Sequence, residues 1–358
     1  MTDYMKWIRR IFLGIVALLL VFIVAAFAIP YFFKDQIVAV VKEEVNKNVH
    51  ATVDFSDADL SLIRNFPRIS LRLTDVKVTG MDEFEGVRLA SVPQFDLAFY
   101  FWSVIKADQP IGIHSIGLTD PDIHVVVLKN GKANYDIALP STDTVASAST
   151  PFEVSLQSYG IKNGHLVYDD RSAEVYAELT GLNHKGSGNF TNTLFDIDTE
   201  TKVDALTAVS GGITYLSKAA VQLDAVIGAD LDQMLFTLKD NDAMINALRL
   251  LLEGSLQIRE NDYLLDLAFK APENDFKHFL SLIPNAYTQG YENVKATGRF
   301  ALAGQVKGAY DINTGALPAF NLDMQIENGQ VQYPDLPMAI EQIAADIKVN
   351  SPSSNLDK

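Results

Sequence analysis

The residues best able to do chemistry in this chain are its histidines and the acidic residues beside them. The six histidines are His50, His114, His124, His165, His184 and His278. They lie far apart, and no two form the helical pair with an intervening Glu that binds catalytic zinc. Asp120-Pro121-Asp122 with His124 comes nearest to a carboxylate and histidine cluster. The alternating apolar residues on both sides of it favour two strands joined by a proline turn, so we expect no metal site.

Other patterns of catalytic residues are also missing from the sequence. There is no Gly-x-Ser-x-Gly elbow, no phosphate-binding loop and no dinucleotide fingerprint. The chain has no cysteine, which excludes disulfides, thiolate nucleophiles and cysteine metal sites. We therefore expect no enzyme, no catalytic residues and no cofactor, and a function that depends on shape.

An uncharged run of 23 residues, Ile11 to Phe33, follows a basic N-terminus. About 20 apolar residues in a helix cross the hydrocarbon of a bilayer, so this run predicts one transmembrane helix within residues 1–33. Arg9 and Arg10 place the N-terminus in the cytoplasm and the rest of the chain across the membrane. Trp7 and Tyr31 are the expected anchors at the two interfaces.

Two features near the span leave alternatives open. Ala26-Phe27-Ala28 matches the cleavage pattern of a signal peptide, although the apolar run is longer than such a segment needs. Residues 34–50 predict an amphipathic helix, because Ile37, Val41, Val45 and Val49 recur every four residues. This helix either packs on the first strands or lies near the bilayer and plugs a groove.

The charge of the exported part argues against nucleic acid as a partner. The whole chain has a net charge of −16, and removal of residues 1–33 leaves 26 basic against 44 acidic residues, a net −18. Phosphate binding needs clustered Lys and Arg, and the sequence has no such run. Contact with lipid beyond the span should therefore be apolar.

From residue 51 onward, short runs of period two alternate with turn residues, which predicts a mainly β fold: a long, antiparallel, curled and groove-like sheet after the N-terminal transmembrane helix, with a few short helices. The predicted strands include Ile69–Val78, Gln94–Tyr100, Ile111–Leu118, Ile123–Leu128, Glu174–Leu182, Phe195–Asp204, Val221–Ile227, Gly254–Arg259, Tyr263–Lys270, Lys295–Ala303, Phe320–Glu327 and Ile343–Val349. A slip in phase predicts a bulge near Thr74 and Asp75. Helices are predicted at Asp242–Leu252 and Asn274–Ile283.

The unpatterned Ser, Thr and Ala stretch at residues 141–150 is the expected linker or loop. It separates a first β-unit at residues 51–140 from a second at residues 151–358.

A curled single sheet would leave its apolar strand faces lining an open groove, and such a surface must be covered by another apolar molecule. Acyl chains are suitable, since each buried methylene contributes about 0.8 kcal/mol. The candidate groove-lining residues are Ile69, Leu71, Leu73, Leu97 and Phe99. We expect them to face a continuous open surface.

Several short motifs, in this order behind one N-terminal span, resemble the AsmA family of envelope proteins in the form found in Bacteroidetes-like bacteria. They are Val53–Ser56, Asn65–Leu71, Leu73–Gly80, Leu89–Val92, Ile116–Ile123, Gly131–Asp136, Phe276–Pro284 and Tyr333–Pro337. That family is similar to the chorein-type bridge proteins, whose β-groove carries lipids between membranes.

The resemblance implies a single-pass inner-membrane protein whose bulk lies in the periplasm and moves phospholipid or another acyl lipid toward the outer membrane. The alternative is a periplasmic scaffold that assists outer-membrane assembly proteins through strand-edge contacts. Members of the family are usually longer, so we expect the second unit to be truncated at its C-terminus.

Overall fold

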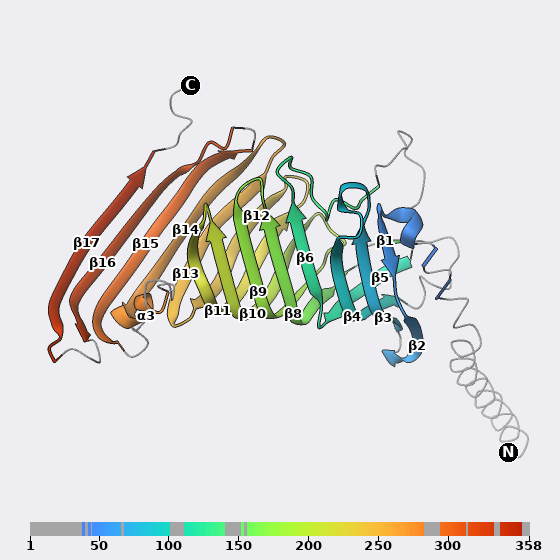
Figure 1. The fold of residues 1–358 in the computed structure, drawn as a ribbon, viewed down its shortest axis with the longest axis horizontal. Helices are drawn as coiled ribbons and strands as arrows, with labels where there is room; N and C mark the ends of the chain where they lie inside the picture. The colour runs from blue at the N-terminus through green and yellow to red at the C-terminus, as the bar shows by residue number, and fades with distance from the viewer. Residues whose placement is uncertain are drawn as a thin grey trace, which may run out of the picture. The chain divides into compact units, whose positions relative to one another are not determined.

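The computed structural model describes residues 38–39, 42–43, 45–65, 68–100, 111–139, 152–153, 156–282, 294–312, 314–332 and 337–352 (Figure 1). The prediction of a mainly β fold with few helices is confirmed. No described helix is long and apolar enough to cross a membrane. The span predicted from Ile11 to Phe33, with Trp7, Arg9, Arg10 and Tyr31, lies outside the described residues.

The chain divides into two compact units. The first lies within Met1–Leu118 and Asp136–Val154, and the second within Thr119–Tyr135 and Ser155–Lys358. Residues 119–135 group with the second unit because one of their strands pairs there. Each unit is built around its own cluster of buried apolar residues.

The first unit contains a small sheet centred on one long strand. Its elements are β1 (Ala51–Asp54), β2 (Asp57–Asn65), β3 (Arg68–Gly80), η1 (Asp82–Phe84), β4 (Arg88–Tyr100), β5 (Ile111–Thr119) and β7 (Phe152–Glu153). β3 pairs antiparallel with β1 and β2 on one side and with β4 on the other. β5 and β7 form a parallel pair.

The phase slip expected near Thr74 and Asp75 marks the place where β3 exchanges partners. Thr74 pairs with β2, and Lys77 pairs with β1. Asp75 has a φ of 53°, so the backbone turns locally and Leu73 and Val76 both face the core. The pairing of β3 with β4 keeps its register through this point, so the slip is a kink rather than a bulge in that ladder.

The second unit is a long sheet in which neighbouring strands follow chain order. Its elements are β6 (Asp122–Val127), β8 (Ser158–Asp170), β9 (Val175–Gly188), β10 (Leu194–Ser210), β11 (Ile213–Asp230), β12 (Leu235–Ile245), β13 (Leu248–Ile258), β14 (Asp262–Asp275), α3 (Phe276–Leu280), β15 (Lys295–Asp311), β16 (Ala319–Gln332) and β17 (Ile340–Ser351). From β8 to β17 each strand pairs antiparallel with the next, whereas β6 pairs parallel with β8. The sequence predicted the antiparallel succession but not the parallel pair.

The prediction of a helix at Asp242–Leu252 is wrong, because this segment forms the hairpin between β12 and β13. Ile245 pairs with Leu248, and Asn246 between them has a φ of 53°. The helix propensity of these residues is outweighed by strand pairing on both sides, since β12 also pairs with β11 and β13 also pairs with β14.

The helix predicted at Asn274–Ile283 exists but is shorter. β14 continues to Asp275, and α3 begins at Phe276. The side chain of Asp275 caps it by accepting a hydrogen bond from the backbone N–H of Lys277 at 3.2 Å. Figure 1 shows α3 at the end of β14, and it contacts β14 and β15.

The described residues of the amphipathic segment before β1 are helical at 38–39, 42–43 and 45–48. Val38 packs on the core of the first unit, and Lys42 lies 5.0 Å from the ring centroid of Phe55. Asn46 Oδ1 accepts a hydrogen bond from the backbone N–H of Val53 at 2.8 Å, and its Nδ2 donates to the Val53 carbonyl. These contacts agree with a helix packed on the first strands.

Candidate functional site

The five candidate groove residues from the sequence lie together in the first unit. Across the β3–β4 ladder Ile69 stands opposite Phe99, and Leu71 stands opposite Leu97. Ile69, Leu71, Leu73 and Phe99 are 5–8% exposed. Leu97 packs against the cluster that contains Leu71, Leu73 and Phe99. Their surroundings are protein side chains of the same unit, so the expected open surface is not found at these positions. A lipid-lining role for them stays a prediction.

The second unit presents a different apolar surface, which the cross-strand registers define. Residues directly opposite each other in a ladder share a face of the sheet, so rows of partners can be followed from strand to strand. One row reads Ile197, Ile227, Leu238, Gly254, Leu267, Val306 and Phe320. A second reads Leu252, Phe269, Gly304, Leu322 and Val349. We call the side of the second-unit sheet that carries these rows the apolar face.

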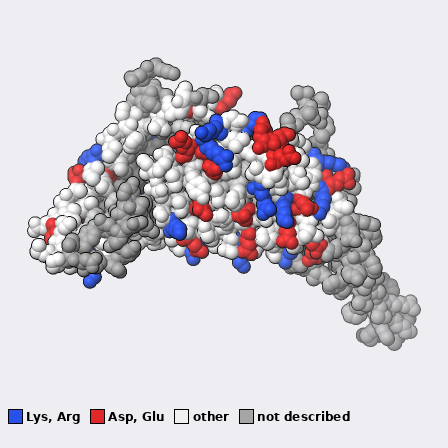
Figure 2. All heavy atoms as spheres, viewed as in Figure 1, with Lys and Arg blue, Asp and Glu red and all other residues white. Residues whose placement is uncertain are grey.

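The opposite side of the same strands is charged. Lys239 Nζ lies 2.5 Å from Asp196 Oδ1, and Lys307 Nζ lies 2.7 Å from Asp266 Oδ2. In Figure 2 basic and acidic side chains are interspersed over the surface in view. The sheet is therefore amphipathic, and its charged side consists of paired rather than single-sign charges.

The apolar face is covered to different degrees along its length. At one place α3 closes over it: Phe279 stacks on Phe300 with ring centroids 4.6 Å apart, and Phe300 is 1% exposed. On the neighbouring strands β16 and β17, Phe320, Ile347 and Val349 are 38–42% exposed. Large apolar side chains thus stay partly open on a face that no second sheet of the described residues covers.

Coordinated irregularities keep the apolar side chains on one face across β8 to β11. The phase of each strand changes where the backbone has positive φ, at Asn163, Gly181 and Lys218, and where the β10 register shifts after Val203. Beyond Asn163, Gly181 and Val203 another apolar row continues through Leu166, Leu179 and Leu206. Its partner on β11 is Ala219, which is reached before the phase change at Lys218. Ala219 lies two residues from Val221 on β11, and Val221 shares a face with Ile227 of the first row, so the rows share one face.

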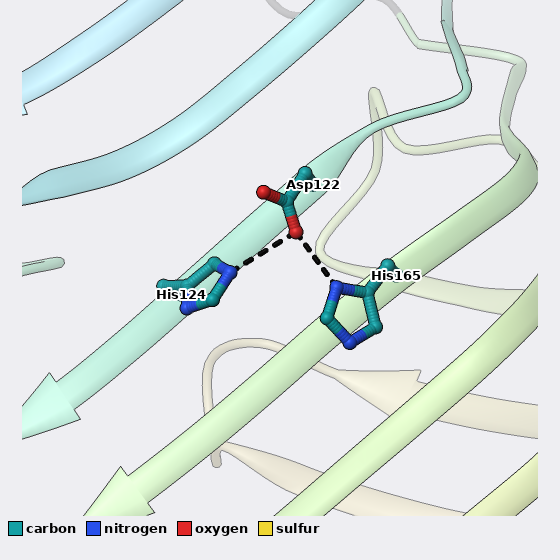
Figure 3. A group of neighbouring side chains, drawn as sticks. All are labelled: Asp122, His124 and His165. Carbon is teal, nitrogen blue, oxygen red and sulfur yellow. Dashed lines mark hydrogen bonds and ion pairs between the residues drawn. The ribbon is translucent and has the colours of Figure 1, made fainter.

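On the charged face of this unit, three side chains converge at the pairing of β6 with β8. Asp122 stands opposite His165, and His124 lies two residues after Asp122 on the same side. Asp122 Oδ1 lies 2.7 Å from His165 Nδ1 and 3.0 Å from His124 Nε2 (Figure 3). The strand, turn and strand expected around Asp120-Pro121 are confirmed, and the parallel pairing adds His165 from a distant part of the sequence.

The hydrogen bonds in this cluster favour the protonated form of one histidine. His165 Nε2 also lies 3.0 Å from Glu178 Oε1, so both ring nitrogens face carboxylates that only accept when ionised. Hydrogen bonds to Asp122 and then Glu178 raise the pKa of His165. Burial opposes ionisation of Asp122, but hydrogen bonds from His165 and His124 outweigh it and lower the pKa of that carboxyl. Hydrogen bonds from His165 and Tyr176 lower the pKa of Glu178.

The sequence placed the candidate groove in the first unit and did not single out the apolar face. A signal for it was present, because Tyr263, Leu265, Leu267 and Phe269 place a large apolar residue at every second position of one predicted strand. What the sequence could not supply was the register, which places such runs opposite one another over ten strands.

A comparison with known families agrees with the motifs. The model of the AsmA family matches residues 5–214, which is more than half of the chain. No curated protein matches the sequence.

Proposed function

Because the chain belongs to the AsmA family, we propose that it holds phospholipid or another acyl lipid on the apolar face of its second unit. In this proposal residues 11–33 anchor the protein in the inner membrane, the N-terminus is cytoplasmic, and both units lie in the periplasm. The protein then acts without catalysis, by sheltering acyl chains from water on their way to the outer membrane.

The observation that carries the proposal is the continuity of the apolar rows from β8 to β17. Ten strands spaced by about 4.8 Å give a face roughly 40 Å across. One leaflet of a bilayer is about 15 Å of hydrocarbon, so an acyl chain would cross only about three strands. A lipid could therefore be passed along the face while it stays in contact with apolar side chains.

The chemistry of the face suits acyl chains better than a folded partner. The large side chains of its rows are aliphatic or aromatic, so what these rows offer is burial of hydrocarbon. The ion pairs on the other face are exposed and contribute little to binding.

Adjacent leucines on β14 allow a matched test. Leu265 lies on the apolar face opposite Leu256, whereas Leu264 lies on the charged face and is 37% exposed. The full-length protein, purified in detergent and exchanged into lipid nanodiscs, is analysed for bound phospholipid by mass spectrometry and for extraction of fluorescent phospholipid from vesicles. Leu265→Asp should reduce both by at least about tenfold, since a charge opposes burial of acyl chains, and Leu264→Asp should leave both unchanged.

Both variants should give the circular dichroism spectrum of the wild type, which serves as the control for folding. If the two folded variants carry as much lipid as the wild type, the proposal is wrong. The alternative, a scaffold that aids outer-membrane assembly proteins through protein contacts, would then be favoured.

A further inference from the structure

The cluster of Asp122, His124 and His165 has the donor atoms of a cation site. Each residue offers one ligand atom, and the three atoms all lie within 4.8 Å of one another. Bonds of about 2.0–2.2 Å from tetrahedral zinc to nitrogen and oxygen place neighbouring ligand atoms roughly 3.3 Å apart. The two distances to Asp122 Oδ1, 2.7 and 3.0 Å, need only a small opening to reach that value.

The strands hold these atoms in place independently of any ion. Asp122 and His165 are register partners on β6 and β8, and His124 follows Asp122 on the same side of β6. The backbone carbonyl of His124 accepts a hydrogen bond of 2.7 Å from Asn134 Nδ2, and Asn134 is 2% exposed. The position of His124 is thus fixed by a buried contact.

A second layer of hydrogen bonds orients the imidazole of His165. Its Nε2–H faces Glu178 Oε1 at 3.0 Å, and the other oxygen of Glu178 accepts from the hydroxyl of Tyr176 at 3.2 Å. Histidines that bind metals commonly donate their second ring N–H to a carboxylate, which fixes the tautomer and raises the basicity of the ligating nitrogen. The arrangement leaves Nδ1 as the ligating atom.

We propose that Asp122, His124 and His165 bind one divalent transition-metal cation of the zinc class. Imidazole and carboxylate ligands suit zinc, cobalt and nickel and exclude a preference for calcium or magnesium. On binding, the cation takes the place of the proton on His165 Nδ1, and Asp122 changes from acceptor to ligand. The side chains are 36–45% exposed, so the cation can enter from solvent, and a fourth position remains for water. The bound cation joins β6 to β8.

The test is a titration of the untagged full-length protein in detergent with Co²⁺, read by visible absorption, followed by displacement with Zn²⁺. The wild type should bind one equivalent and show the absorption of low-symmetry, four- or five-coordinate cobalt. His124→Ala and His165→Ala should each weaken binding by at least about tenfold, and Glu178→Gln should weaken it by about 10–100-fold through the orientation of His165.

His50→Ala is the matched control. His50 Nε2 lies 2.8 Å from Asp82 Oδ2, and within the described part of the chain this pair has no third ligand. Its loss should leave cobalt binding unchanged. Absence of saturable binding to the wild type, or equal binding to a folded variant that carries both His124→Ala and His165→Ala, would overturn the proposal.

Discussion

The ring of Phe269 on β14 lies over Gly304 on β15, so closely that a β-carbon added at residue 304 would stand 2.5 Å from Cζ and 2.7 Å from Cε1 of the ring. The same relationship recurs on the apolar face at Tyr159 and Gly186, where the added carbon would stand 2.4 Å from the ring. Glycine therefore leaves room for a large aromatic ring of the neighbouring strand to lie against the backbone. The ring then covers the position that a β-carbon would otherwise occupy.

Gly304→Ala should lower the free energy of unfolding by about 1–3 kcal/mol, because the new methyl group overpacks against the Phe269 ring. The measurement is the midpoint of urea unfolding. Gly117→Ala is the control, since its added carbon meets only Asp96 Cβ at 3.7 Å, an ordinary contact. Equal midpoints for Gly304→Ala and the wild type would show that the ring moves aside freely.

The side chain of Asn134 substitutes for a strand beside β6. Its Oδ1 accepts a hydrogen bond from the backbone N–H of Val126 at 2.9 Å, and its Nδ2 donates to the carbonyl of His124. Asn134→Ala leaves two part-buried backbone groups unpaired and should destabilise the protein by about 1–3 kcal/mol in the same urea assay. Asn130→Ala should cost less than about 0.5 kcal/mol, since the Asn130 hydrogen bond to Lys132 is exposed and water can replace it. Similar losses for both variants would contradict this explanation.

The strands could be predicted from the sequence because their alternation is local. Tyr263–Lys270, for example, lies within β14. The partners could not be predicted, because the pairing of β6 with β8 joins Asp122 to a histidine that no spacing rule relates to it. The burial of the groove candidates could not be predicted for a similar reason. Alternation shows that Leu71 and Phe99 share a face of the sheet, but it does not show that Phe55 and Val38 pack against that face.

The turn between β12 and β13, in the segment for which a helix was expected, allows a further prediction. Asn246 forms the turn between β12 and β13 with a φ of 53°, where its Oδ1 accepts from the backbone N–H of Ala220 at 2.8 Å and its Nδ2 donates to the carbonyl of Ser281 at 2.6 Å. Asn246→Val should destabilise by about 2 kcal/mol or more, since a β-branched residue resists this φ and loses both hydrogen bonds.

Asn246→Gly keeps the backbone freedom and loses only the hydrogen bonds. It should therefore cost about 1 kcal/mol less than Asn246→Val in urea unfolding. The opposite order would mean that the backbone conformation of this turn does not limit stability.

His165 and His184 should titrate on opposite sides of the ordinary histidine value of about 6.5. Hydrogen bonds to Asp122 and Glu178 raise the pKa of His165, while burial lowers the pKa of His184, which lies on the apolar face against Tyr159. NMR spectra of the histidine rings in metal-free protein, assigned with His165→Gln and His184→Gln, measure both values. A common midpoint would contradict the environments described.

The two shifts have opposite consequences for stability. The folded state holds the His165 proton more tightly than the unfolded state, so this contribution is fully present below about pH 6.5 and is lost as pH rises through the raised pKa of His165. Because the folded-state pKa of His184 is depressed, protonation favours unfolding, and stability falls as pH decreases from about 6.5 through that pKa. His165→Gln should therefore flatten the decline in unfolding free energy above pH 6.5, and His184→Gln should flatten the decline below it.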